Sequence, residues 1–212
     1  MECSICQTRR SRRFCPGVHG NICSLCCGAE REVTVDCPLD CEFLREGRRH
    51  EKAPARNAAE FPNRDIQVPE KLVRANEKLL TVLSSTIFHT AMHVPGVFDC
   101  DVLEALDGLI RTYRSLESGV YYESRPSNPL AGSLYATVQD ALTAYRSSEQ
   151  QELGMTKTRD ADVLGLLVFL QYFALSRDNG RRRGRAFLEA LREFHPPPPE
   201  PSGSSPSSMI LR

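Results

Sequence analysis

The chain of 212 residues balances 27 Lys and Arg against 27 Asp and Glu, and it contains nine cysteines. A formal net charge of zero provides no whole-chain attraction to nucleic acid or to a membrane surface. The length fits one domain of ordinary size with a small additional module, and a hydrophobic fraction of 41% is sufficient for a packed core in the larger part.

Eight of the nine cysteines lie in the first 41 residues, and we interpret residues 1–44 as a zinc-binding cysteine module. Cys3 and Cys6 are separated by two residues, a spacing that directs two thiolates toward one tetrahedral zinc ion. Eight thiolates fill the coordination of two zinc ions, the predicted cofactors. The predicted ligands are Cys3, Cys6, Cys15, Cys23, Cys26, Cys27, Cys37 and Cys41.

The simplest arrangement of these ligands is interleaved. Cys3, Cys6, Cys23 and Cys26 form the first predicted site, and Cys15, Cys27, Cys37 and Cys41 form the second. Adjacent Cys26 and Cys27 serve different ions because neighbouring side chains diverge from the backbone. In an alternative assignment, His19 pairs with Cys15, and Cys26 or Cys27 is then not a ligand.

The order of the pairs resembles the interleaved double-zinc fingers of the MYND and HIT families, which have a treble-clef or cross-brace arrangement. The pairs that carry the resemblance are Cys3-x2-Cys6, Cys15-x3-His19, Cys23-x3-Cys27 and Cys37-x3-Cys41. The chain departs from those families at Cys37, where they usually have histidine. The module is also similar to N-terminal cysteine modules of uncharacterised bacterial proteins, which imply no function. The resemblance to MYND and HIT fingers implies binding to other proteins rather than chemistry.

The cellular compartment decides between zinc and disulfides. The start, MECSICQTRR, lacks the apolar region of a signal peptide, and the longest apolar run, Val163 to Leu175, is too short to span a bilayer. We therefore expect a soluble, cytoplasmic protein, in which closely spaced cysteines bind metal. The disulfide alternative would require export.

Residues 45–68 are rich in charge and proline and are predicted to be a linker. From residue 69 to residue 195 the apolar spacing is helical, and no strand pattern interrupts it. The fold class is therefore mainly α, with a C-terminal bundle of about five helices. The helices are expected from Pro69, from Asp99 as N-cap, from Asn128-Pro129, from Asp160 to Ser176, and from Gly184 to Phe194. Residues 196–212 are predicted to be a disordered tail.

The predicted helix from Asp160 to Ser176 is apolar on nearly all sides between Val163 and Leu175. A helix with apolar residues all around is normally surrounded by other helices. We therefore expect this helix to form the centre of the bundle.

Two Arg-rich segments allow an alternative function in nucleic-acid binding. The first contains Arg9, Arg10, Arg12 and Arg13, and the second contains Arg181, Arg182, Arg183 and Arg185. Two zinc ions and eight thiolates would give the loaded module a formal charge of about −3, which opposes long-range attraction to phosphates. We expect the second segment to be a solvated turn.

His89 and His93 lie one helical turn apart, with Asp99, Cys100 and Asp101 following closely. A metal site there would make the bundle a metalloenzyme, which is a weaker alternative. The pattern lacks the glutamate of a metalloprotease motif, because Thr90 occupies its position. The sequence thus favours a non-enzymatic zinc protein that presents a protein-interaction surface beside a helical bundle.

Overall fold

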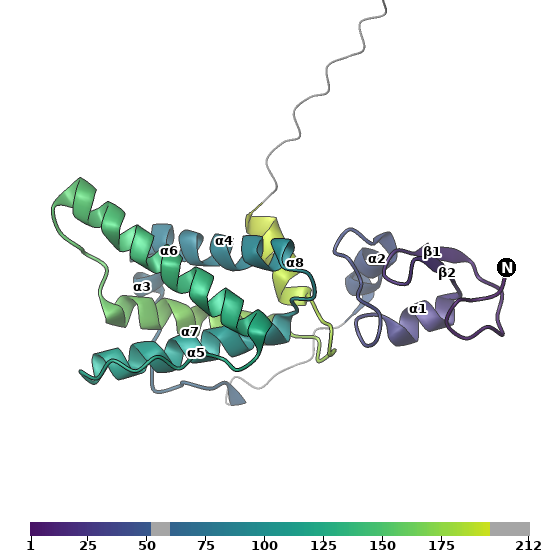
Figure 1. Ribbon diagram of the computed structural model, residues 1–212, viewed down its shortest axis with the longest axis horizontal. Coiled ribbons are helices and arrows are strands. Elements are labelled where there is room, and N and C mark those ends of the chain that lie inside the picture. Colours follow the sequence, from purple (N-terminus) through teal and green to yellow (C-terminus); the bar gives the residue numbers. More distant parts are fainter. Residues whose placement is uncertain (52–59, 196–212) are drawn as a thin grey trace, which may run out of the picture.

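The computed structural model describes residues 1–51 and 60–195. Figure 1 shows two bodies: a small cysteine module, with the N-terminus at its far end, and a larger bundle of helices. The middle of the predicted linker and the predicted tail lie outside the described residues. No helix in the described parts of the chain has the length and apolar character needed to cross a bilayer.

The cysteine module consists of a short hairpin and two helices. Strand β1 (Arg13–Cys15) pairs antiparallel with β2 (Gly20–Ile22), with Cys15 opposite Gly20. Helix α1 (Ser24–Glu30) follows directly, and α2 (Glu42–His50) begins immediately after Cys41. Helix α2 therefore continues into the start of the predicted linker. Apart from cysteines, the buried residues of the module's apolar cluster are Ile22, Val35 and Leu44.

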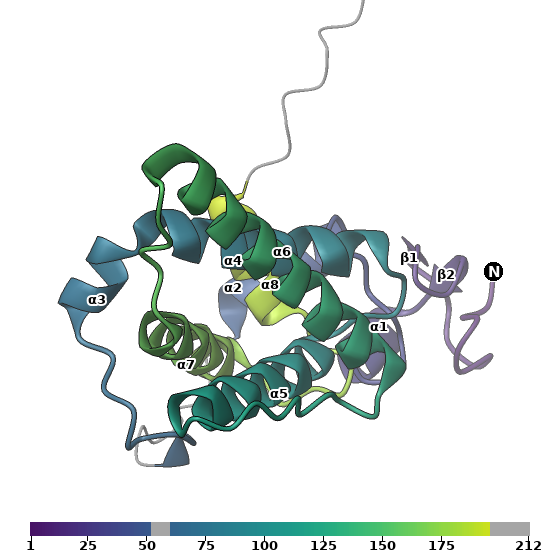
Figure 2. The same ribbon diagram turned by 60° about the vertical axis from the view of Figure 1, so that its left-hand side comes forward.

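The bundle contains the remaining helices in chain order. They are α3 (Glu70–Ala75), α4 (Glu77–His93), α5 (Asp99–Glu117), α6 (Pro129–Leu153), α7 (Asp160–Arg177) and α8 (Ala186–Phe194). Figures 1 and 2 show α4 beside α6 in one layer and α5 beside α7 in the other, while α8 contacts both α4 and α7. The predicted mainly helical class is confirmed.

The number of helices differs from the prediction. The described residues form eight helices, two of them in the module. The helix predicted from Pro69 is divided at Asn76, where the backbone φ of −117° and ψ of 29° leave the helical range. The Asn76 side chain donates a hydrogen bond to the carbonyl of Leu72 at 3.0 Å. The Asn76 amide bonds to the same carbonyl at 3.2 Å, and such back-bonding by a side chain favours a bend in the helix.

Two predicted helix starts have different outcomes. Asn128 caps α6 as expected, because its side-chain oxygen accepts a hydrogen bond from the Leu130 amide at 3.0 Å. Asp99 is not the N-cap of α5: Phe98 occupies that position, and its amide donates to the Asp101 carboxylate at 2.8 Å. Asp99 instead accepts hydrogen bonds from the amides of Phe187 and Leu188 at the start of α8.

Helix α7 packs against α3, α5 and α8, as expected for a central helix. Every residue from Asp162 to Val168 is buried. One side is less covered, because Phe169, Tyr172 and Phe173 line a shallow open cleft together with the segment from Phe61 to Val68. The bundle therefore surrounds most of α7 but leaves part of its second half at the surface.

Candidate metal centre

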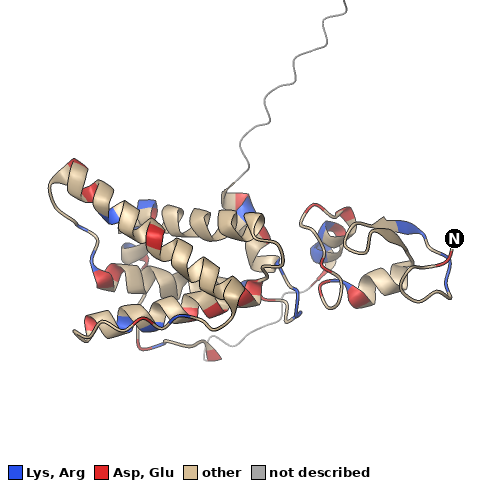
Figure 3. Cartoon of the chain, viewed as in Figure 1, with Lys and Arg blue, Asp and Glu red and all other residues tan. Residues whose placement is uncertain are grey.

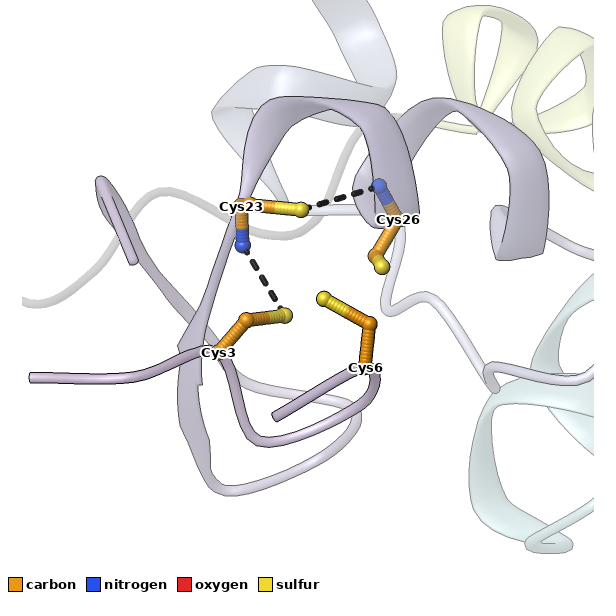
Figure 4. A group of neighbouring side chains, drawn as sticks. All are labelled: Cys3, Cys6, Cys23 and Cys26. Carbon is orange, nitrogen blue, oxygen red and sulfur yellow. Dashed lines mark hydrogen bonds between the residues drawn. The ribbon is translucent and has the colours of Figure 1, made fainter. Parts of the chain in front are cut away.

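Four cysteines from two parts of the module converge on one point. The sulfur atoms of Cys3, Cys6, Cys23 and Cys26 all lie within 4.8 Å of one another, and three of these residues are buried. Figure 4 shows the four side chains directed toward a common centre. Among the described residues this is the one His, Cys, Asp and Glu group with that geometry. The first set of predicted ligands is therefore brought together.

The local backbone explains this convergence. A turn carries Cys3 and Cys6, with the Gln7 amide donating to the Cys3 carbonyl at 2.8 Å and with Gln7 in the left-handed region at φ 54°. Cys23 is the N-cap of α1, and Cys26 lies one turn later. The Cys23 amide donates to the Cys3 sulfur at 3.2 Å, and the Cys26 amide donates to the Cys23 sulfur at 3.4 Å. Amide donors at a helix N-terminus stabilise thiolates.

The pKa values of three of these thiols are shifted, and not all in the same direction. Hydrogen bonds from the Thr8 side chain and nearby amides lower the pKa of Cys6 to about 5, and the Cys26 amide lowers that of Cys23. Hydrogen bonding to Cys23 raises the pKa of Cys26 to about 12. A divalent cation bound between the four sulfurs would replace the thiol protons and allow all four to ionise. Four thiolates suit a soft, tetrahedral metal site.

The other four predicted ligands line a second, small cavity. Cys15, Cys27, Cys37 and Cys41 all contribute to its wall, beside Phe43 and other residues of the module. His19 is exposed, has a left-handed backbone at φ 52°, and is not among the residues that line this cavity. The four cysteines line one cavity, but among the described residues their sulfur atoms do not come within 4.8 Å of one another as those of the first group do.

Arginine side chains approach the sulfurs of both groups. The guanidinium of Arg13 lies 3.7 Å from the Cys27 sulfur and stacks on Phe43, and that of Arg31 lies 3.9 Å from the same sulfur. A hydrogen bond to Cys23 raises the pKa of Arg9. Burial raises the pKa of the Cys37 thiol to about 11, so its ionisation depends on a nearby positive charge. Arg9 and Arg13 of the first Arg-rich segment therefore approach sulfur atoms, although Arg9 is exposed, as Arg10 and Arg12 are.

The second Arg-rich segment is not a solvated turn, and that expectation is wrong. Arg181 forms an ion pair with Glu51 at 2.6 Å, and the side chains of Arg183 and Arg185 bond to the module. The module residue at the centre of these contacts is Glu32, whose side chain is fully buried. Sequence reasoning missed Glu32, because nothing in its local pattern distinguishes it from a surface glutamate.

The residues of the alternative metal site in the bundle are not brought together. His89 and His93 are both exposed, and the Nδ1 atom of His93 bonds to the carbonyl of His89 at 2.7 Å. The carboxylates of Asp99 and Asp101 bond to backbone amides instead, and Cys100 is exposed. The His93 side chain therefore bonds to a backbone carbonyl at the C-terminal end of α4.

Comparison with known proteins adds no assignment. No protein-family model, curated protein or solved structure matches this chain. The resemblance to MYND and HIT fingers therefore rests on the cysteine spacing alone.

Proposed function

We propose that this chain is a non-enzymatic zinc protein whose module binds two zinc ions and presents a surface to a partner protein. The observation that carries the proposal is the convergence of Cys3, Cys6, Cys23 and Cys26. Four protein sulfurs satisfy a tetrahedral ion and leave no position for water or substrate, as in structural zinc sites. This site supports stabilisation of the module rather than hydrolysis.

The second zinc ion is supported by the cavity that Cys15, Cys27, Cys37 and Cys41 line. Adjacent Cys26 and Cys27 contribute to different groups, as the interleaved arrangement requires. The guanidinium groups of Arg13 and Arg31 beside Cys27 would offset the negative charge of a tetrathiolate centre.

The partner is a protein because the module exposes large apolar side chains. Phe14 on β1 is 58% exposed and Leu25 on α1 is 63% exposed, although few apolar residues are available for the module's own core. Exposed aromatic and aliphatic side chains beside arginine are typical of protein contacts. Arg10 and Arg12 supply that charge next to β1.

Metal content provides the first test. Elemental analysis of protein purified under reducing conditions should give two zinc ions per chain. Cys27→Ser should retain one ion, whereas His19→Ala should retain both, because His19 lies outside the second cavity. A wild-type content near one, or iron with visible absorption, would contradict the two-zinc assignment.

Partner class is tested separately. A protein captured by the wild-type chain should not be captured by the double variant Phe14→Ser and Leu25→Ser, which should still hold two zinc ions. Salt-dependent retardation of DNA or RNA that disappears in Arg10→Ala and Arg12→Ala together would instead favour the nucleic-acid alternative.

A further inference from the structure

Glu32 is a buried charge that joins the module to the bundle. Its carboxylate accepts hydrogen bonds from Arg48 at 2.5 Å, from Asn179 at 2.9 Å and from the Arg185 amide at 3.0 Å. Its backbone carbonyl accepts a further bond from the Arg183 amide at 2.8 Å. A fully buried carboxylate is stable only when such partners surround it. Docking of the two bodies therefore depends on the exact position of the turn that carries Glu32.

Opposite charges extend this contact on both sides. The segment before α8 and α8 itself contribute arginines, and the facing loop of the module contributes acidic residues, which meet at the junction in Figure 3. Arg185 bridges the two bodies, because its guanidinium bonds to Asp36, to the Cys37 carbonyl at 3.2 Å and to the Val97 carbonyl at 3.0 Å. Arg192 pairs with Asp40 at 2.7 Å.

The module residues in these contacts come from one part of its sequence. All of them follow Cys27, and none comes from the hairpin or from the turn that holds Cys3 and Cys6. They are Glu32, Thr34, Asp36, Cys37, Asp40, Arg48 and Glu51. The docking surface thus belongs to the segment that contains Cys37 and Cys41, two of the four cysteines of the second group.

The second group also frames the docking turn. Glu32 lies midway between Cys27 and Cys37 and has a left-handed backbone at φ 55°, a conformation that an L-residue adopts only when its surroundings impose it. Cys41 precedes α2, the helix that positions Arg48 against Glu32. Fixing these cysteines on one ion would fix both the turn and the helix.

We infer that zinc occupancy of the second group, Cys15, Cys27, Cys37 and Cys41, controls docking of the module onto the bundle. The inference rests on the proposed two-zinc assignment and adds that only the second ion is coupled to docking. Loss of the second ion allows the Glu32 turn to move away from its hydrogen-bond partners. An unpaired carboxylate is unfavourable when buried, so Glu32 would become solvent-exposed and the two bodies would separate. Loss of the first ion leaves the docking segment in place. A low zinc concentration would thereby expose the surfaces of the module and the bundle that face each other in the docked state.

Hydrogen exchange of the intact zinc-loaded chain tests this inference directly. The amides of Arg183 and Arg185 donate to Glu32, so a peptide covering residues 181–186 reports docking. In Cys37→Ser and Cys41→Ser together, exchange there should be at least about tenfold faster than in wild type. In the matched variant, Cys3→Ser and Cys6→Ser together, it should remain slow, and exchange within α5 should be unchanged in both.

Metal analysis of the same samples separates the two ideas. If the Cys37 and Cys41 variant holds one zinc yet retains wild-type protection at residues 181–186, the inference is wrong and the two-zinc proposal stands. Equal loss of protection in both paired variants also overturns it. If wild type holds a single zinc, the two-zinc proposal fails, and the inference fails with it. Glu32→Gln should retain two ions and show faster exchange at residues 181–186, which assigns the effect to docking rather than to metal.

Discussion

The two bodies of this chain reach stability by different means. The bundle buries a large apolar cluster from all of its longer helices, whereas the buried non-cysteine members of the module's cluster are Ile22, Val35 and Leu44. The free energy gained from apolar burial is proportional to the area buried, and three residues therefore contribute little to folding. Structural zinc ions can supply it instead. Under the proposed zinc binding, metal would stabilise the module and apolar packing the bundle.

Metal removal should produce the largest difference between the two bodies. Binding of a structural zinc ion contributes about 10–16 kcal/mol in small zinc-finger peptides, so a strong chelator should abolish the fold of the module. Trypsin should then cleave rapidly at Arg9–Arg13, while the helical signal of the bundle and its cooperative thermal transition persist.

A chain that starts at residue 60 provides the control for metal removal. Phe61 packs against Tyr172 with ring centroids 5.3 Å apart and a tilt of 48° between the rings, and the Asn63 side chain donates a hydrogen bond to Gln171 at 2.7 Å, so this segment belongs with the bundle. The shortened chain should unfold cooperatively and independently of chelator. Absence of a thermal transition would show that the bundle needs the module.

Core packing should give the next largest effect. Leu167 is fully buried in α7, so Leu167→Ala should lower the free energy of unfolding by about 2–5 kcal/mol. Phe169 lines the open cleft, and Phe169→Ala should cost less than Leu167→Ala in the same denaturant experiment. Equal costs would mean that the cleft is closed in solution.

The surface control for this series should be Glu152→Ala, expected to change stability by less than about 0.5 kcal/mol. Glu149 is unsuitable although it lies on the same helix. Its carboxylate accepts hydrogen bonds from the amides of Lys157 and Thr158 and from the Thr158 hydroxyl. Glu149→Ala would therefore also loosen the connection between α6 and α7.

Gly47 offers a smaller test within the module. A Cβ atom there would collide with the guanidinium of Arg31, which lies 3.9 Å from the Cys27 sulfur. Gly47→Ala should change the stability of the zinc-loaded module by less than about 1 kcal/mol, because only the flexible end of Arg31 must move and alanine favours a helix more than glycine does. Competition with a chelator should show faster release of one zinc ion, while Gly28→Ala, with no atom near its Cβ, should release zinc at the wild-type rate.

A further prediction concerns the pH dependence of the bundle's stability. Burial raises the pKa of Asp99 from 3.8 to about 7, although two α8 amides oppose the shift. The folded state therefore favours the protonated carboxyl, so this contribution to stability is complete below about pH 4 and is lost as the pH rises through 7. Between pH 6 and pH 8, wild type should lose about 1.4 kcal/mol relative to Asp99→Asn. Parallel pH profiles of the two proteins in denaturant would refute the raised pKa.

Local patterns in the sequence predicted much of the fold. The spacing of Cys3, Cys6, Cys23 and Cys26 predicted the first cluster, and Asn128-Pro129 predicted the start of α6. The junction was not predictable in this way. Glu32 meets Asn179 across 147 residues, and no short-range period encodes such a pair. The sequence shows a basic segment but not the acidic loop that neutralises it.

The separation between Glu32 and its partners also has a consequence for synthesis. Arg183 and Arg185 emerge from the ribosome about 150 residues after Glu32, so the junction closes one of the longest loops in the chain. N-terminal regions generally fold first during translation. A module that binds zinc as proposed would therefore acquire its metal while its acidic loop is still exposed to water. Chains released before metal loading would carry that loop and the junction arginines, Arg183, Arg185 and Arg192, without their partners, in the state most accessible to proteases.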